Sequence, residues 1–166
     1  MKSPFKTAPV ELNLIVCLGK DNLLGDANPA GNGLLWHSAE ELRYYKSRTV
    51  GNVVLFGLTT AQYVPLELMK KNRTVEVLDF GMDIDGILAK YADSGKSVFI
   101  CGGYSIYILF LENYVLDHLY ISRLKPHVPV AAAKSPLYFP DPAAFGYKLA
   151  ESVEHEDFFA ESWVLK

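Results

Sequence analysis

The chain has 166 residues, a formal net charge of −3, and a composition that is 50% hydrophobic and 21% charged. A chain of this length fits one compact domain with a core of normal size, so we expect a single domain over residues 1–166, with 1–9 as a flexible N-terminal extension. The slight negative charge does not favour nucleic acid or an anionic membrane as a partner. Without a membrane-spanning run or a recognisable signal peptide, a cytoplasmic protein is expected.

The first third of the chain predicts a buried strand, a long loop and a helix. Residues 10–19 form an apolar run rich in β-branched side chains, which is typical of a buried strand. Residues 21–36 carry three Gly, three Asn and one Pro, as a functional or disordered loop does. Ser38 is expected to cap a helix that runs to about Arg48, with Glu41 as its capping-box partner.

The rest of the chain alternates strands with helices and ends in strands only. Strands are expected at 52–57, 73–79, 97–103 and 116–124. Helices are expected at 59–64, 83–93 and 104–113. The segment 146–166 predicts an antiparallel hairpin. This alternation indicates an α/β fold, in which a mainly parallel sheet has helices on both faces and ligands bind at the carboxyl ends of the strands.

Two of the expected strands end in glycine and lead directly into a helix. One ends at Gly57, and the other at Gly102 and Gly103. Glycine lets a backbone approach a ligand closely, and the free N–H groups of a helix start bind anions. Two such strand ends on one sheet would suit a dinucleotide pyrophosphate. Ordinary turns are the alternative for each, and the G-x-G-x-x-G pattern is absent.

The cysteines and histidines do not predict a chemical site of their own. Cys17 and Cys101 lie in apolar runs and are expected to be buried, reduced thiols, although a disulfide stays open if the two runs are neighbouring strands. Neither has a basic neighbour that would activate it as a nucleophile. No metal site is expected, because the histidines are scattered along the chain at positions 37, 118, 127 and 155.

Glu40 and Glu41 stand side by side in the first turn of the expected helix. Consecutive helical residues lie about 100° apart, so the two carboxylates cannot share a side. Glu41 lies near the apolar face with Leu42 and Tyr45, and we expect these to bury it and raise its pKa. Glu40 is expected to be a solvated charge. A favourable interaction of Glu41 with the helix dipole is the alternative explanation.

Taken in order, these segments resemble dihydrofolate reductase. The pattern W-x-x-x-x-E-L-x-x-Y from Trp36 to Tyr45, the strand VVLFG, and GGYSIY at 102–107 carry the resemblance together with LNLIVCLGKDNLLG, RTVEVL, LDHLYISRL and YFPD. The resemblance covers the chain from about residue 12 to its end. It implies an eight-stranded, mainly parallel sheet and hydride transfer from a nicotinamide cofactor, NADPH by family expectation, to dihydrofolate. It also implies that antifolate inhibitors bind.

The resemblance assigns site residues position by position. The catalytic group comprises Glu41, which holds the pterin and assists its protonation, Trp36, which organises water, and Ser122, whose hydroxyl supports the carboxylate. Arg73 pairs with the folate α-carboxylate. The other substrate-lining positions are Ile15, Cys17, Leu42, Tyr45, Val64 and Cys101. The cofactor positions are Leu24, Gly25, Gly57, Leu58, Thr59, Thr60, Asp79, Gly102, Gly103, Tyr104, Ser105, Ile106 and Tyr107. The segment 25–36 matches a mobile loop that closes over the nicotinamide.

Several positions depart from the family pattern. Where the family commonly has a cation and polar residues around the cofactor's 2′-phosphate, this chain has Leu58 and Thr59, and then Asp79 and Phe80. A carboxylate there suits a free ribose hydroxyl, so NADH is an alternative cofactor. Leu35 replaces the usual Pro before Trp36, and the stretch 127–134 lacks the acidic residue that braces the mobile loop in many members.

Two alternatives to an active dihydrofolate reductase stay open. One is a reductase of the same fold that acts on another pterin or a pyrimidine, which would not need the carboxylate-binding Arg73. The other is a non-catalytic binding protein that kept the fold and lost the cofactor, as Leu58 and Asp79 suggest. A monomer is expected in each case, because no unpartnered amphipathic segment remains.

Overall fold

The computed structural model describes residues 5–29, 33–79 and 81–166. It contains a seven-stranded sheet with the strand order β4-β3-β5-β1-β6-β9-β8 and a separate two-stranded sheet of β2 and β7. The described parts of the chain divide into two compact units, and β1 (Leu12–Leu18) contributes residues to both. The α/β class and the mainly parallel sheet predicted from the sequence are confirmed.

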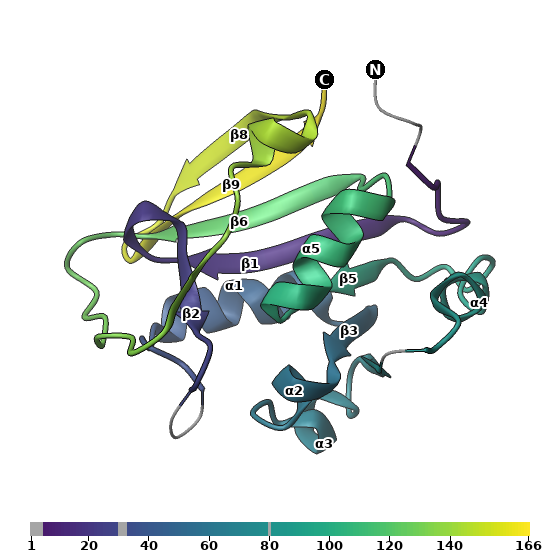
Figure 1. The fold of residues 1–166 in the computed structure, drawn as a ribbon, viewed down its shortest axis with the longest axis horizontal. Coiled ribbons are helices and arrows are strands. Elements are labelled where there is room, and N and C mark those ends of the chain that lie inside the picture. The colour runs from purple at the N-terminus through teal and green to yellow at the C-terminus, as the bar shows by residue number, and fades with distance from the viewer. Residues whose placement is uncertain (1–4, 30–32, 80) are drawn as a thin grey trace. The chain divides into compact units, whose positions relative to one another are not determined.

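The first unit comprises residues up to Leu14 and the segment Thr49–His118. Its strands run parallel, and β5 lies between β1 and β3, because Val98 is paired with both Leu12 and Val53. Here α5 packs against β3 and β5 (Figure 1). The strands are β3 (Val53–Gly57), β4 (Thr74–Leu78) and β5 (Val98–Ile100). The helices are α2 (Leu58–Ala61), α3 (Leu66–Met69), α4 (Ile84–Ala89) and α5 (Tyr104–Asn113).

The second unit comprises Ile15–Arg48 and Leu119–Lys166. The strands β6, β9 and β8 form an antiparallel ribbon in which β9 pairs with both neighbours (Figure 1). The strands beyond β1 are β2 (Leu23–Asp26), β6 (His118–Leu124), β7 (Pro136–Tyr138), β8 (Tyr147–Glu154) and β9 (Phe158–Leu165). The helices are α1 (Ala39–Thr49) and the short 3-10 turns η1 (Lys20–Asn22) and η2 (Pro142–Phe145).

The continuous apolar runs of the sequence became the core. All five residues of β3 are buried, as are six of the seven residues of β1 and all of β5. Burial on both faces explains why these strands lack an alternation of polar and apolar residues. The antiparallel C-terminal hairpin is also confirmed, with Tyr147 paired to Leu165 and Glu154 to Phe159.

The expected eight-stranded sheet was wrong in its count. The main sheet of the described residues has seven strands, and β2 pairs instead with β7, joining Leu23 to Tyr138 and Asp26 to Pro136. The expected loop 21–36 therefore begins with η1 and β2, because backbone pairing to a distant segment, rather than a local apolar pattern, orders these residues. β7 and α3 were not expected from the sequence.

The N-terminal segment contacts the end of α5 where the structure describes it. Residues 1–4 lie outside the described part of the chain, and Lys6 forms a parallel bridge with Tyr114. A flexible extension over 1–9 and a single domain stay predictions. No helix within the described residues is long and apolar enough to cross a membrane.

Candidate active site

The second unit places Glu41 at the start of α1, and Ser38 caps this helix as predicted. The Glu41 N–H donates to Ser38 Oγ at 3.2 Å. The Glu41 carboxylate is engaged by β6, since Ser122 Oγ donates to Glu41 Oε2 at 3.0 Å. The carboxylate thus faces β6, whereas a capping box would turn it back to Ser38.

Burial dominates the electrostatics of Glu41. Desolvation raises the pKa of its carboxyl from 4.5 to about 7, and the hydrogen bond from Ser122 offsets part of this rise. A carboxyl with a pKa near neutrality is present in both its protonated and ionised forms at physiological pH. It can therefore donate a proton to a heterocycle or accept one from it.

Cys17 and Trp36 lie beside this carboxyl. Burial raises the pKa of the Cys17 thiol well above its ordinary value, the charge of Glu41 raises it further, and a side-chain hydrogen bond with Trp36 opposes these effects. A thiol held protonated is a poor nucleophile, so the raised pKa does not favour a nucleophilic role for Cys17. Cys17 and Cys101 are both free, as expected, but each is half-buried, whereas the sequence predicted buried thiols.

The apolar neighbours expected around Glu41 differ in their burial. Ile15 is buried at 3% exposure, and Tyr45 is half-buried. Leu42 is 45% exposed, so the desolvation of Glu41 does not come from a buried Leu42 as its helical position suggested. A first-turn position gives the side of the helix on which a residue lies but not the depth of its neighbours.

Glu40 is not the solvated charge that the sequence predicted. Its carboxylate accepts the backbone N–H of Asp157 at 2.8 Å and that of Glu156 at 3.3 Å, both in the β8–β9 turn. The side chain of Glu40 retains 28% exposure. Its partners are more than a hundred residues away in sequence, which is why no local rule could identify them.

In the first unit, the glycine-ended strands meet closely. The Gly57 N–H donates to the Gly102 carbonyl at 2.7 Å. A Cβ added to Gly57 would lie 2.7 Å from Ile106 Cγ1, and one added to Gly103 would lie 2.5 Å from Thr60 Oγ1. A side chain at either glycine would therefore force Ile106 or Thr60, on the helices that follow the strands, to shift. The close approach of the two strand ends brings the predicted cofactor positions on α2 and α5 together.

The start of α5 offers backbone N–H groups at this edge of the sheet. Its first residue is Tyr104, its N-cap is Gly103, and no side chain of the described residues caps it. Gly102 has a φ of 120°, a region that L side chains rarely adopt, and the ring of Tyr107 lies against it. An uncapped helix start next to residues without Cβ atoms suits an anionic group such as a phosphate.

Two further positions of the predicted cofactor site lie at neighbouring strand ends. Gly57 is paired with Leu78 in the parallel β3–β4 ladder. Leu58 and Asp79 are therefore the first residues after the ends of two adjacent strands. Leu58 is 49% exposed, and the Asp79 N–H donates to Met82 Sδ. Phe80 lies outside the described residues. Neither Leu58 nor Asp79 offers a positive charge.

Arg73 is also held in a defined orientation within the first unit. Its Nη1 donates to Thr49 Oγ1 at 3.2 Å, and its Nε donates to Asn72 Oδ1 at 3.0 Å. Thr49 is fully buried and Arg73 is half-buried. Val64 and Cys101, which were expected to line the substrate pocket, belong to the same unit and are half-buried.

Comparison with known proteins decides the family. A profile described as dihydrofolate reductase matches residues 11–160. The chain belongs to the dihydrofolate reductase family. It is 26% identical to dihydrofolate reductase type 3 of Salmonella typhimurium over 153 residues, which cover 87% of each chain. It is 24% identical to a dihydrofolate reductase of Staphylococcus haemolyticus over 123 residues, or 69% of this chain and 70% of the relative.

The segment that resembles the family's mobile loop is braced by an acid that the sequence did not reveal. The Asp26 carboxylate accepts backbone N–H groups of Asn28, Lys134 and Ser135 at 2.9–3.1 Å. Leu24 and Gly25 belong to β2, so this part of the segment is paired strand. Residues 30–32 lie outside the described part. Asp26 thus links this segment to Lys134 and Ser135 through backbone N–H groups.

Arg123 and its neighbours form a second arrangement that the sequence did not reveal. Arg123 Nε donates to Glu161 Oε1 at 2.8 Å, and Arg123 Nη1 donates to Asn22 Oδ1 at 2.6 Å. Asn22 adopts a positive φ of 65° immediately before β2. Its amide also donates to the Phe139 carbonyl. Nothing local in the sequence links these residues, which are brought together by strand pairing.

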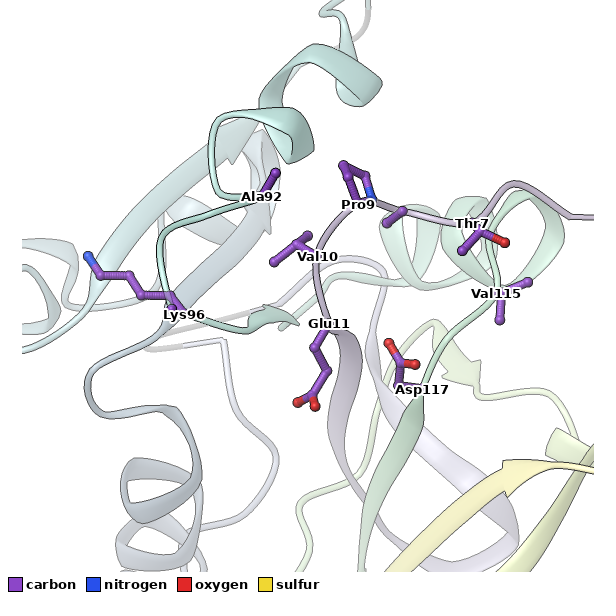
Figure 2. Close-up of a pocket in the computed structure, with 10 residues that line it drawn as sticks. Thr7, Pro9, Val10, Glu11, Ala92, Lys96, Val115 and Asp117 are labelled. Atoms are coloured by element: carbon purple, nitrogen blue, oxygen red, sulfur yellow. The ribbon is translucent and has the colours of Figure 1, made fainter.

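A cavity of about 480 Å³ lies at the other end of the strands in the first unit (Figure 2). Glu11, Lys96 and Asp117, which line it, precede β1, β5 and β6. Its charged groups are engaged: Glu11 by Asn13 and Ser97, Lys96 by a threonine of β4, and Asp117 by a backbone N–H of β1. Open α/β sheets bind their ligands at the carboxyl ends of the strands, so this cavity lies at the end where no ligand is expected.

Among the described residues, no group of three or more His, Cys, Asp or Glu is arranged to hold a metal ion.

Proposed function

We propose that this chain reduces 7,8-dihydrofolate to 5,6,7,8-tetrahydrofolate. The observation that carries the proposal is the half-buried Glu41 carboxyl, which desolvation gives a pKa of about 7 and which accepts a hydrogen bond from Ser122 at 3.0 Å. Reduction of the pterin adds a hydride to carbon and a proton to the adjacent nitrogen. A reduced nicotinamide dinucleotide, when bound, supplies the hydride. The residues of this chain assist the transfer of the proton.

In this proposal Glu41 binds the pterin and assists its protonation. The ionised carboxylate accepts N–H donors of the pterin ring, and the protonated form delivers a proton, through water organised by Trp36, to the nitrogen beside the hydride-accepting carbon. Ser122 donates to Oε2 of Glu41 at 3.0 Å. An ionised carboxylate offers about four acceptor sites, so both oxygens keep capacity for the N–H donors of the substrate.

A nucleotide pyrophosphate fits the edge of the first unit. Gly57 and Gly103 have no room for a Cβ, and α5 begins there without a side-chain cap. Backbone N–H groups of this kind hold phosphate oxygens. The residues implied to hold the nucleotide are those following the two glycine-ended strands, including Thr60 and Tyr107.

The identity of the nucleotide rests on Leu58 and Asp79. The family implies NADPH, whereas a carboxylate beside an apolar side chain favours a free ribose hydroxyl and hence NADH as the second candidate. Titration with each nucleotide, followed by nicotinamide fluorescence, measures the two dissociation constants. Weakening of NADH binding in Asp79→Asn, with no such weakening for NADPH, would support the second candidate. An NADPH preference of a hundredfold or more in the natural chain would refute it.

The test of the proposed reaction is Glu41→Gln. Loss of general-acid assistance lowers turnover of dihydrofolate by about 10²–10⁴-fold at neutral pH. Glu156→Gln is a matched control, because it removes one carboxylate in the same unit whose side chain has no role in the proposal. Near-full activity in Glu41→Gln, with the chain folded, would overturn the assignment of Glu41.

Measurements on the natural chain also test the two alternatives to a dihydrofolate reductase. Arg73 supports a substrate with a carboxylate tail, so a reductase of another pterin or a pyrimidine is favoured only if dihydrofolate is not turned over. Binding of neither nucleotide at millimolar concentration would favour a non-catalytic binding protein. We further propose one monomeric domain that acts in the cytoplasm and binds antifolates; light scattering, cell fractionation and inhibitor titration test these points.

A further inference from the structure

The start of α1 and the β8–β9 turn hold each other through reciprocal hydrogen bonds. Ser38 Oγ donates to Asp157 Oδ2 at 2.6 Å. In the other direction, the Glu40 carboxylate accepts the backbone N–H groups of Asp157 at 2.8 Å and of Glu156 at 3.3 Å. We name Ser38, Glu40, Glu156 and Asp157 the helix–turn clamp. Its bonds join residues 116 to 119 positions apart, so it exists only in the folded chain.

The direction of the Ser38 hydroxyl is set by Asp157. A serine hydroxyl has one hydrogen to donate and two lone pairs that accept. The hydrogen goes to Asp157, which leaves the lone pairs for the Glu41 N–H at 3.2 Å. Ser38 is only 6% exposed, so little water can compete for this hydroxyl. Asp157 therefore acts on the backbone of Glu41 through Ser38.

Asp157 is well suited to remain an acceptor. Its pKa is lowered first by the hydrogen bond from Ser38 and then by His127, whose Nε2 lies 3.1 Å from Asp157 Oδ1. The ionised form accepts but does not donate, so it can only receive the Ser38 hydrogen. On the other side of the clamp, His155 Nδ1 lies 3.9 Å from Glu40 Oε2.

The same framework holds the other end of Glu41. The strand β9 follows Asp157 directly and pairs with β6, joining Phe158 to Leu124 and Ala160 to Ser122. The Lys125 N–H donates to the Asp157 carbonyl at 2.8 Å. The clamp fixes the Glu41 backbone from the turn, and Ser122 fixes its carboxylate from the strand beside that turn.

We propose that Asp157 is a positioning residue for Glu41, which sets the helix start so that the Glu41 carboxylate meets the Ser122 hydroxyl. This deepens the proposed function by naming what holds the acid in place. It rests on the proposed function only where turnover of dihydrofolate is interpreted. The titration of the Glu41 carboxyl can be measured without substrate or nucleotide.

The experiment is a titration of the Glu41 carboxyl by carbon-detected NMR, with no substrate or nucleotide present and with Glu41→Gln to assign the signal. Asp157→Ala removes the acceptor for Ser38. Glu156→Gln is the matched control, because it removes one carboxylate next to Asp157 and leaves the backbone N–H of the clamp. Asp157→Asn keeps an oxygen that accepts from Ser38, and it is the conservative rescue.

In Asp157→Ala we expect the Glu41 midpoint to rise by about half a pH unit over that of Glu156→Gln, since a looser geometry forfeits part of the Ser122 hydrogen bond. Asp157→Asn should match the control. Equal midpoints in Asp157→Ala and Glu156→Gln would overturn the proposal. So would a shift in Asp157→Asn as large as in Asp157→Ala, because charge rather than the hydrogen bond would then be the cause.

A second variant covers failure of Asp157→Ala to fold. Ser38→Gly removes the hydroxyl, and glycine at an N-cap costs a helix little. The same rise in the Glu41 midpoint is expected, and its absence would refute the role of Asp157 through Ser38. If the clamp variants shift the Glu41 midpoint but the natural chain does not reduce dihydrofolate, the positioning role of Asp157 is supported and the proposed function is refuted. If the natural chain reduces dihydrofolate but the variants leave the midpoint unchanged, the proposed function is supported and the positioning role is refuted.

Discussion

The burial of Glu41 has a consequence for stability that is separate from catalysis. Glu41→Gln keeps the length of the side chain and an oxygen that accepts from Ser122, but it removes the ionisable group. The pKa of the Glu41 carboxyl is about 7 in the folded chain, against 4.5 for an exposed glutamate. Below about pH 4.5 the group is neutral in both states and costs nothing.

The sign and size of the effect follow from this difference. Between the two pKa values the folded chain keeps a proton that the unfolded chain has released, so the free energy of unfolding of the natural protein falls as the pH rises. A difference of about 2.5 units corresponds to about 3.4 kcal/mol at 1.36 kcal/mol per unit. Partial solvent contact of Glu41 reduces this to about 2–3 kcal/mol. The Gln variant, which has no charge to bury, should gain that amount over the natural chain by about pH 8.

Urea unfolding of both proteins at several pH values from about 4.5 to 8.5 measures this gain. Taking the difference between the two proteins cancels the groups that titrate in both. The difference should be flat above about pH 8 and fall steadily below pH 7. Glu156→Gln serves as the control, and it should show no comparable slope. A pH-independent difference for Glu41→Gln would refute the raised pKa of this carboxyl and the desolvation that causes it.

Three further predictions concern the supporting residues. Ser122→Ala removes the hydrogen bond that lowers the Glu41 pKa, so the NMR midpoint of that carboxyl should rise by about half to one unit; an unchanged midpoint would contradict the contact. Gly57→Ala places a Cβ 2.7 Å from Ile106 Cγ1 and should cost about 1–3 kcal/mol in thermal unfolding. Combined with Ile106→Ala, it should cost less than the sum of the single changes, and strict additivity would exclude the clash. Arg73→Lys loses the planar fork and should raise KM for dihydrofolate about tenfold with little change in kcat, whereas a substrate without the carboxylate tail should be insensitive.

The elements that the sequence predicted well are those whose pattern is local and long. The helix expected at 104–113 is found as Tyr104–Asn113, and the apolar run 52–57 contains the buried strand Val53–Gly57. By contrast β2 and β7 have four and three residues, too few to show a period, and neither is fully buried. Their existence depends on each other, so no segment of the sequence predicts either alone.

The candidate site divides in the same way. The Ser38 cap could be predicted because its partner is three residues away. The contact of Ser122 with Glu41 joins residues 81 positions apart, and only the family resemblance suggested it. The contacts of Glu40 and Asp26 also join distant segments, and nothing pointed to them. Long-range hydrogen bonds of single polar side chains leave no periodic trace in a sequence.

Glu40 and Glu41 show why residue type alone does not assign chemistry. Both are glutamates in the first turn of α1, separated by the roughly 100° rotation between helical neighbours. Glu40 accepts two backbone N–H groups. Glu41 accepts one hydroxyl, which favours its ionised form, but the desolvation of its carboxyl outweighs this hydrogen bond and favours the protonated form. The Glu40 carboxylate also helps to hold the start of α1, the helix that carries Glu41. Removing Glu40 should therefore disturb the titration of Glu41 without any contact between the two carboxylates, and a Glu40→Gln chain in which Glu41 titrates as in the natural protein would show that Ser38 and Asp157 suffice to position it.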